Sequence, residues 1–223
     1  MKTTTIALRR VRKACLLLLL AAMVMPSAGC SLASMLGLVG DALDTPSVPA
    51  QYVPPKTSPM LVMVENRRNP GMIWAESEQL AAFISSELTI HKVCPVIAQG
   101  KLSDLRDKDP QAMRRMSITA IGKAAAAQQM LYVDLTSVDM PGVVGAPVRG
   151  RIEMRVHVID VASGKTVWPI APNEATSLSF EAQAPLTMES DRMVVFTQGL
   201  LRGAGRNVAR LFYEYNPTDD EQK

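Results

Sequence analysis

The sequence has few of the residues from which metal sites are built. Among its 223 residues there are three cysteines and two histidines, His91 and His157. It contains no HExxH motif and no cluster of His, Asp or Glu at the spacing of metal ligands. We therefore expect neither a metal site nor a bound cofactor.

The motifs of acyl and phosphoryl transfer are also absent. No GxSxG segment places a serine on a nucleophile elbow. The segment Ser163-Gly164-Lys165-Thr166 has the ending of a phosphate-binding loop, but Ile159 stands where that loop needs glycine, and a strand follows instead of a helix. We interpret the segment as a turn and expect that the protein is not an enzyme.

Aromatic residues and clustered positive charges are scarce as well. The four Phe, four Tyr and two Trp are too few for a surface that stacks nucleic-acid bases. The formal net charge is +3, but the first 29 residues hold five basic and no acidic residues, so the rest of the chain carries 3 − 5 = −2. Because no basic cluster remains to attract phosphates, we expect no nucleic-acid partner.

The amino terminus has the parts of an export signal. Basic residues at positions 2, 9, 10, 12 and 13 precede the apolar run Ala14–Met25, and small residues lead from there to Cys30. This run is too short for a membrane-spanning helix, which takes about 20 residues. We predict that residues 1–29 are a signal peptide that is removed.

Residues 27–30, Ser-Ala-Gly-Cys, resemble the lipobox of bacterial lipoproteins, although Ser27 stands where that motif usually has leucine. The resemblance implies that Cys30 is lipidated and that the membrane is a partner of the mature protein. Ser31 resembles the sorting pattern of the outer membrane more than that of the inner one. The alternative is ordinary cleavage, which leaves Cys30 as a thiol in a periplasmic or secreted protein. Cys94, in an apolar run, should be a buried and inert thiol.

A flexible, proline-rich linker is predicted at residues 30–58, after the lipidated cysteine. Prolines at positions 46, 49, 54, 55 and 59 interrupt every regular pattern in its second half. Where it is extended, such a segment spans about 3 Å per residue and holds a domain away from the bilayer. The alternative is that the segment wraps the surface of the domain.

Residues 59–216 are predicted to form a single α/β (α+β) domain, followed by a disordered tail at 217–223. Short β-rich runs alternate with segments that repeat apolar residues every three or four positions. The expected strands are 60–64, 93–99, 130–138, 150–158, 165–168 and 177–182. The expected helices are 76–92, 110–127 and 190–215, with loops at 101–109 and 139–147. This order predicts a mixed sheet of about five or six strands layered with three main helices.

A β-hairpin over Gly150–Ile170 is the centre of this prediction. In its first strand the apolar positions 152, 154, 156 and 158 should face the core, while Arg151, Arg155 and His157 should face water. Ser163-Gly164 supplies the turn between the two strands.

This hairpin, from Val156 to Trp168, and the run Met130–Asp134 after an alanine-rich helix resemble the periplasmic α/β domain of several envelope lipoproteins. The family includes the curli-secretion channel lipoprotein, the outer-membrane lipoprotein activators of penicillin-binding proteins, and the amino-terminal domain of the Tol-system propeller protein. The resemblance covers about residues 58–215. It implies a non-catalytic module that docks on another envelope protein.

We therefore expect an accessory or docking module of an envelope assembly, secretion or cell-wall complex, whose partner is an envelope protein or a second copy. Val143 and Val144 in the loop at 139–147 are candidate contacts, together with the sheet edge. Arg151, Arg155 and His157 on the wet face are further candidates. The alternative is a solute-binding or auxiliary component of an export system, which a deep pocket lined by these three residues would favour.

Overall fold

The computed structural model describes residues 46–66, 74–139, 149–170, 176–183 and 190–220. The predicted signal peptide, Cys30 and the candidate contacts Val143 and Val144 lie outside the described residues. The chain divides into two compact units, and the larger one, Val48–Tyr215, contains every strand of the described residues. In the smaller unit, Pro217–Asp220 forms the 3-10 helix η2, where we expected a disordered tail.

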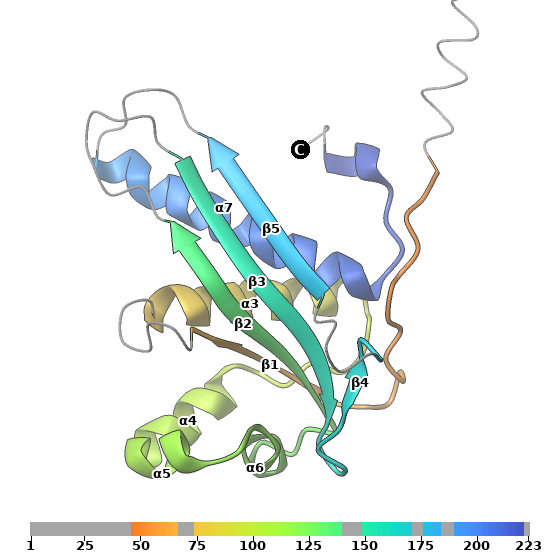
Figure 1. Ribbon diagram of the computed structural model, residues 1–223, viewed down its shortest axis with the longest axis vertical. Helices are drawn as coiled ribbons and strands as arrows, with labels where there is room; N and C mark the ends of the chain where they lie inside the picture. The colour runs from red at the N-terminus through yellow and green to blue at the C-terminus, as the bar shows by residue number, and fades with distance from the viewer. Residues whose placement is uncertain (1–45, 67–73, 140–148, 171–175, 184–189, 221–223) are drawn as a thin grey trace, which may run out of the picture. The chain divides into compact units, whose positions relative to one another are not determined.

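A five-stranded mixed sheet forms the centre of the larger unit (Figure 1). Its strands are β1 (Met60–Glu65), β2 (Gln129–Asp139), β3 (Arg149–Asp160), β4 (Thr166–Trp168) and β5 (Thr176–Gln183). β1 and β2 are parallel, whereas β3 pairs antiparallel with β2, β4 and β5. β4 pairs with the end of β3 and β5 with its first two-thirds, so both lie on the side of β3 away from β2. The predicted mixed α/β sheet is confirmed.

One face of the sheet is covered by α3 (Trp74–Ile90) and α7 (Ser190–Ala209). The alternation predicted for β3 is present, because every second residue from Ile152 to Val158 is buried. These side chains pack with apolar residues spaced three and four apart on the two helices, which is the spacing of a stripe on one helical face. The residues of this stripe are Leu80, Ile84 and Leu88 in α3 and Leu200, Leu201, Ala204 and Val208 in α7.

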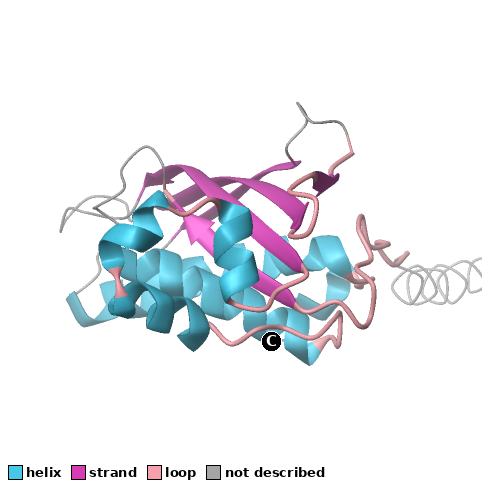
Figure 2. Ribbon diagram, turned by 90° about the horizontal axis from the view of Figure 1, so that it is seen from below, coloured by secondary structure: helices cyan, strands magenta, loops and turns pink. Residues whose placement is uncertain are grey.

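The opposite face has a smaller core at its β1–β2 side. Leu61, Met63, Met130 and Tyr132 point to this face and pack with Ile121. Three short helices accompany them: α4 (Gly100–Lys108), α5 (Pro110–Arg115) and α6 (Ile118–Ala124) (Figure 2). Neither α4 nor α5 has a buried residue, so this second layer is packed far less closely than the first.

The single helix expected over 110–127 is interrupted. Its start is as predicted, because the Asp109 carboxylate accepts hydrogen bonds from the backbone N–H groups of Gln111 and Ala112. Met116 then adopts an extended conformation, and Ser117 caps α6 by accepting from Ala120 N at 3.1 Å. A second strong N-cap in the segment therefore produces two helices in place of one.

The segment between α3 and α5 also differs from prediction. The expected strand at 93–99 is wrong, because the segment forms only an isolated bridge between Met60 and Val96. Pro95 has no N–H to donate to a ladder, which explains why the pairing does not extend. The loop expected at 101–109 is the helix α4, whose Leu102 and Leu105 pack on the smaller core.

The last part of the predicted linker belongs to the domain. Backbone hydrogen bonds join Val48 to Tyr215, and the N–H groups of Gln51 and Tyr52 donate to Leu211 O. The Tyr52 ring lies 6.1 Å from the ring of Phe212. Residues 48–58 therefore wrap the surface, which was the alternative to an extended linker, and the compact unit begins at Val48 instead of residue 59.

The helix expected to reach Tyr215 ends at Ala209 and continues as the 3-10 helix η1 (Arg210–Phe212), because Tyr215 bridges Val48 in extended backbone.

Candidate functional site

The turn between β3 and β4 is stabilised by hydrogen bonds among its own residues. Gly164 has a φ of +72°, a left-handed conformation that favours glycine, and its N–H donates to Asp160 O at 2.8 Å. The Asp160 carboxylate accepts from Ser163 Oγ at 2.6 Å and from Ser163 N at 2.7 Å. These hydrogen bonds favour the ionised form and lower the pKa of Asp160. The backbone therefore turns here as predicted and leads into β4, so it offers no phosphate-binding loop.

The candidate residues Arg151, Arg155 and His157 lie in a row on one face of β3, as predicted. Arg151 pairs with Glu153 at 2.6 Å and with Glu181 of β5 at 3.2 Å. Arg155 is exposed, and the half-buried His157 ring lies 6.5 Å from the ring of Tyr132. Because alternate residues of a strand are spaced along its length, the three side chains form a polar row and do not surround a pocket.

Within the described parts of the chain, no three His, Cys, Asp or Glu side chains come together as a metal site would require. The described helices also include none with the length and apolarity needed to span a membrane. Cys94 is 8% exposed, and burial raises the pKa of its thiol, in keeping with the predicted inert cysteine. Trp168 is likewise a core residue, packed between Tyr52 and Phe212.

The two edges of the sheet differ in whether their outer backbone groups are already hydrogen-bonded. At the β1 edge, Met60 N donates to Pro95 O at 2.8 Å, and Ile97 N donates to Met60 O at 2.9 Å. Further along the same strand, Gln99 Nε2 donates to Val62 O at 3.0 Å and also to Ser85 Oγ. Backbone and side-chain groups of residues 95–99 therefore occupy hydrogen-bonding positions that an added strand would need.

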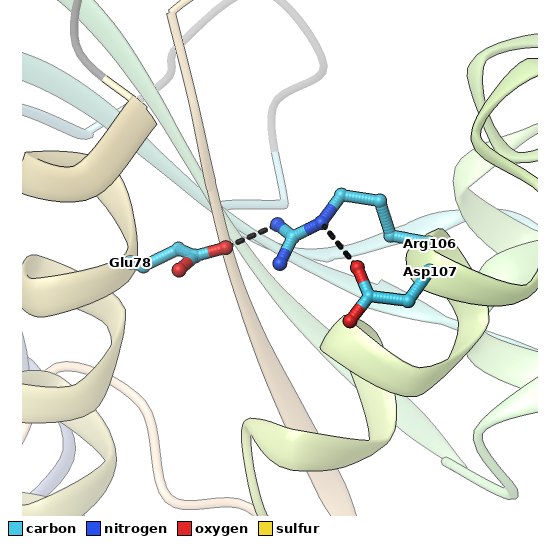
Figure 3. Close-up of polar contacts among 3 residues, drawn as sticks. All are labelled: Glu78, Arg106 and Asp107. Carbon is cyan, nitrogen blue, oxygen red and sulfur yellow. Dashed lines mark hydrogen bonds and ion pairs between the residues drawn. The ribbon is translucent and has the colours of Figure 1, made fainter.

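An ion pair joins the two helices next to β1. Arg106 of α4 extends its guanidinium to the Glu78 carboxylate of α3, and its Nε lies 3.6 Å from Asp107 Oδ1 (Figure 3). The Arg106 side chain is 22% exposed and that of Glu78 47% exposed. Such a partly exposed pair stabilises the protein little by itself, since exposed pairs contribute about 0 to 1 kcal/mol. It nevertheless places a side chain of α4 in contact with one of α3 beside β1.

β5 forms the opposite edge and has no such cover. It pairs with β3 through eight residues, Thr176 to Gln183, and among the described residues no backbone group pairs with its other side. Its odd positions are exposed, whereas Leu178, Phe180 and Ala182 pack on the main core. The strand contains no proline and no lysine, two residues that commonly protect an edge from further pairing. β5 is therefore the edge of the described sheet that can accept another strand.

The sequence indicated an edge strand here but did not show which edge is open. The cover on β1 comes from Gln99, which lies 37 positions from Val62, and the ion pair joins residues 28 positions apart. Contacts at such separations leave no local pattern in the sequence.

No protein-family model matches the chain, and no curated protein matches it either. Among solved structures it is similar to the lipoprotein GNA1162 from Neisseria meningitidis, with 10% identity and a TM-score of 0.43 over 66% of this chain and 97% of that one. It is also similar to the PelC dodecamer from Paraburkholderia phytofirmans, with 10% identity and a TM-score of 0.40 over 75% and 96%. For the LpoB C-terminal domain from Salmonella enterica the identity is 20% and the TM-score 0.35 over 66% and 94%. The similar structures thus include bacterial lipoproteins, but because each TM-score is below 0.5 we take no function or partner from them.

Proposed function

We propose that the protein is a non-catalytic lipoprotein of the bacterial envelope whose domain docks a partner protein by adding a strand to the free edge of β5. The observation that carries this proposal is the contrast between the two sheet edges. Residues 95–99 occupy the β1 edge, whereas β5 presents eight residues whose outer side has no partner among the described residues.

Strand addition is a common way to recognise an extended segment. Backbone hydrogen bonds provide affinity, and alternate side chains of the added strand provide specificity. On β5, an added strand would meet the apolar side chains of Leu178 and Phe180 on the core side. On the other side it would meet serines and the Arg151–Glu181 ion pair. The partner segment should therefore alternate between apolar and polar residues.

The predicted anchor is compatible with docking to a protein near the membrane. Lipid on Cys30 would tether the domain, which begins at Val48, through residues 31–47. A chain of that length reaches on the order of 60 Å when fully extended. The absence of nucleophile, phosphate-loop and metal-ligand motifs from the sequence supports a role in binding without catalysis.

Site-specific photo-crosslinking in cells tests the proposal. A photoreactive amino acid is placed at Ser177 or Ser179, which are exposed on β5, and at Asp104 or Lys108, which are exposed on α4, as matched controls. We expect a discrete adduct from the β5 positions and none from the α4 positions. An adduct of twice the chain mass would identify a second copy as the partner. Equal labelling at both sets of positions, or no adduct at β5, would contradict docking at this edge.

A further inference from the structure

A large cavity lies on the opposite side of the domain from the β5 edge. Its volume is about 1310 Å³, and β1, the first half of α3, α4, α5, α6 and the end of β3 supply its lining. This volume exceeds the roughly 300 to 1,000 Å³ of ordinary small-molecule pockets. None of Arg151, Arg155 and His157 lines it, so it is distinct from the polar row on β3.

The lining is rich in apolar side chains that the protein itself does not bury. Leu102 of α4, Met113 of α5, and Met116 and Ile118 beside α6 are only partly buried, although each packs at the margin of the smaller core. α4 and α5 have no buried residue at all. Helices that cover a sheet usually bury an apolar stripe against it. Here Leu102 and Met113 line the cavity and are only partly buried, and methionines adapt to ligands of varied shape.

The charged side chains that line the cavity differ in whether they have a partner. The Glu78 carboxylate and the Arg106 guanidinium pair with each other, and Glu65 Oε2 accepts a hydrogen bond from the Tyr132 hydroxyl at 2.8 Å. Arg114 also lines the cavity, and in the described part of the chain no ion pair includes it. The lining therefore combines apolar side chains, polar and paired charged groups, and Arg114, for which the described part of the chain supplies no carboxylate partner.

We propose that this cavity binds a single-chain amphiphile with an anionic headgroup. The acyl chain lies against Met63, Leu102, Met113, Met116 and Ile118, and Arg114 binds the carboxylate or phosphate. A guanidinium presents paired N–H donors to either group, so the proposal covers both a free fatty acid and a lysophospholipid. It does not depend on strand addition at β5, because the two sites share no residue.

Binding is measured on the full chain carrying Cys30→Ser, so that no covalent lipid competes for the cavity. The probe is 11-(dansylamino)undecanoate, which becomes more fluorescent in an apolar site. It is displaced by palmitate, by palmitoyl-lysophosphatidylglycerol or by the uncharged monopalmitin, each below its micelle concentration. We expect saturable binding of one probe per chain and displacement by one or both anionic lipids. The lipid that displaces the probe more strongly shows whether the natural ligand is a free fatty acid or a lysophospholipid.

Matched variants separate the headgroup from the chain. Arg114→Gln should weaken binding of the anionic lipids about tenfold, the loss expected for one charge-assisted hydrogen bond, while monopalmitin is unaffected. Arg115→Gln is the control, because Arg115 is adjacent and exposed but does not line the cavity.

Met113→Trp should fill the cavity and weaken the binding of all three lipids, whereas Ala112→Trp, at an exposed position of the same helix, should not. Circular dichroism confirms that each variant folds. No saturable binding, unchanged binding in Met113→Trp, or equal effects of Arg114→Gln and Arg115→Gln would overturn the proposal.

Discussion

The ring of Phe180 in β5 lies directly against the backbone of Gly203 in α7. A Cβ atom on Gly203 would overlap Cζ of Phe180 and lie 2.7 Å from its Cε1, closer than real Cβ atoms approach other atoms. The missing side chain therefore lets the strand approach the helix closely. This contact positions β5, and with it the free edge of the sheet, on the core.

Gly203→Ala should destabilise the domain although alanine favours helices. The added methyl group must displace the Phe180 ring, and overpacking of this kind costs about 1 to 3 kcal/mol. Gly199→Ala is the matched control in the same helix, because nothing lies within 4 Å of its Cβ position. That variant should gain up to about 1 kcal/mol from helix propensity. Urea unfolding of both variants measures the difference, and equal stabilities would show that Phe180 moves aside freely.

Gln99→Met should weaken the cover of the β1 edge. The change keeps a side chain of similar length but removes the hydrogen bonds from Nε2 to Val62 O and Ser85 Oγ, each 3.0 Å long. We expect a loss of about 1 to 2 kcal/mol in the free energy of unfolding, since Val62 O loses this donor. Gln128→Met, at an exposed position, should change stability by less than about 0.5 kcal/mol. A loss in the control as large as in Gln99→Met would count against this role for Gln99.

The turn aspartate should titrate below the usual range. The Ser163 hydroxyl and then the Ser163 N–H stabilise the ionised form and lower the pKa of Asp160. The resulting stabilisation is fully present above the ordinary aspartate pKa, near about pH 4, and is lost as the pH falls through the lower pKa of the folded protein. Ser163→Ala should raise the pKa of Asp160 partway toward its ordinary value, because the backbone donor remains. Carboxyl-carbon NMR measures this pKa, and Ser179→Ala on β5 should leave it unchanged.

The lipid anchor is tested in cells. If Cys30 is lipidated, mass spectrometry of the membrane fraction should find a mature chain that begins at Cys30 and carries acyl chains. Globomycin should cause the form that retains the signal peptide to accumulate. Cys30→Ala should release the protein from the membrane, because the variant has no thiol to carry acyl chains. Even one remaining acyl chain would anchor the protein only marginally. A mature chain with an unmodified Cys30 would support the secreted alternative.

Several features that depend on neighbouring residues were predicted correctly. The alternation in β3, the Asp109-Pro110 helix start and the turn at Gly164 each follow from local backbone preferences and side-chain spacing. One error had a local cause, because the Ser117 N-cap divides the helix expected over 110–127. Others occurred where a distant contact prevails. The segment around Pro95 is β-rich but has only the edge of Met60 to pair with, and α4 is polar but packs Leu102 and Leu105 on the sheet.

The sequence by itself determined the periodicity of the strands and helices and the α/β class of the domain. It also led us to expect an exported, non-catalytic protein. Only the tertiary structure decided which sheet edge is open and that a cavity lies beneath α4 and α5. Both depend on contacts between residues far apart in the chain, such as Gln99 with the backbone carbonyl of Val62 and Arg106 with Glu78. Their meeting is set by how whole elements pack against one another, and no short stretch of sequence encodes that geometry.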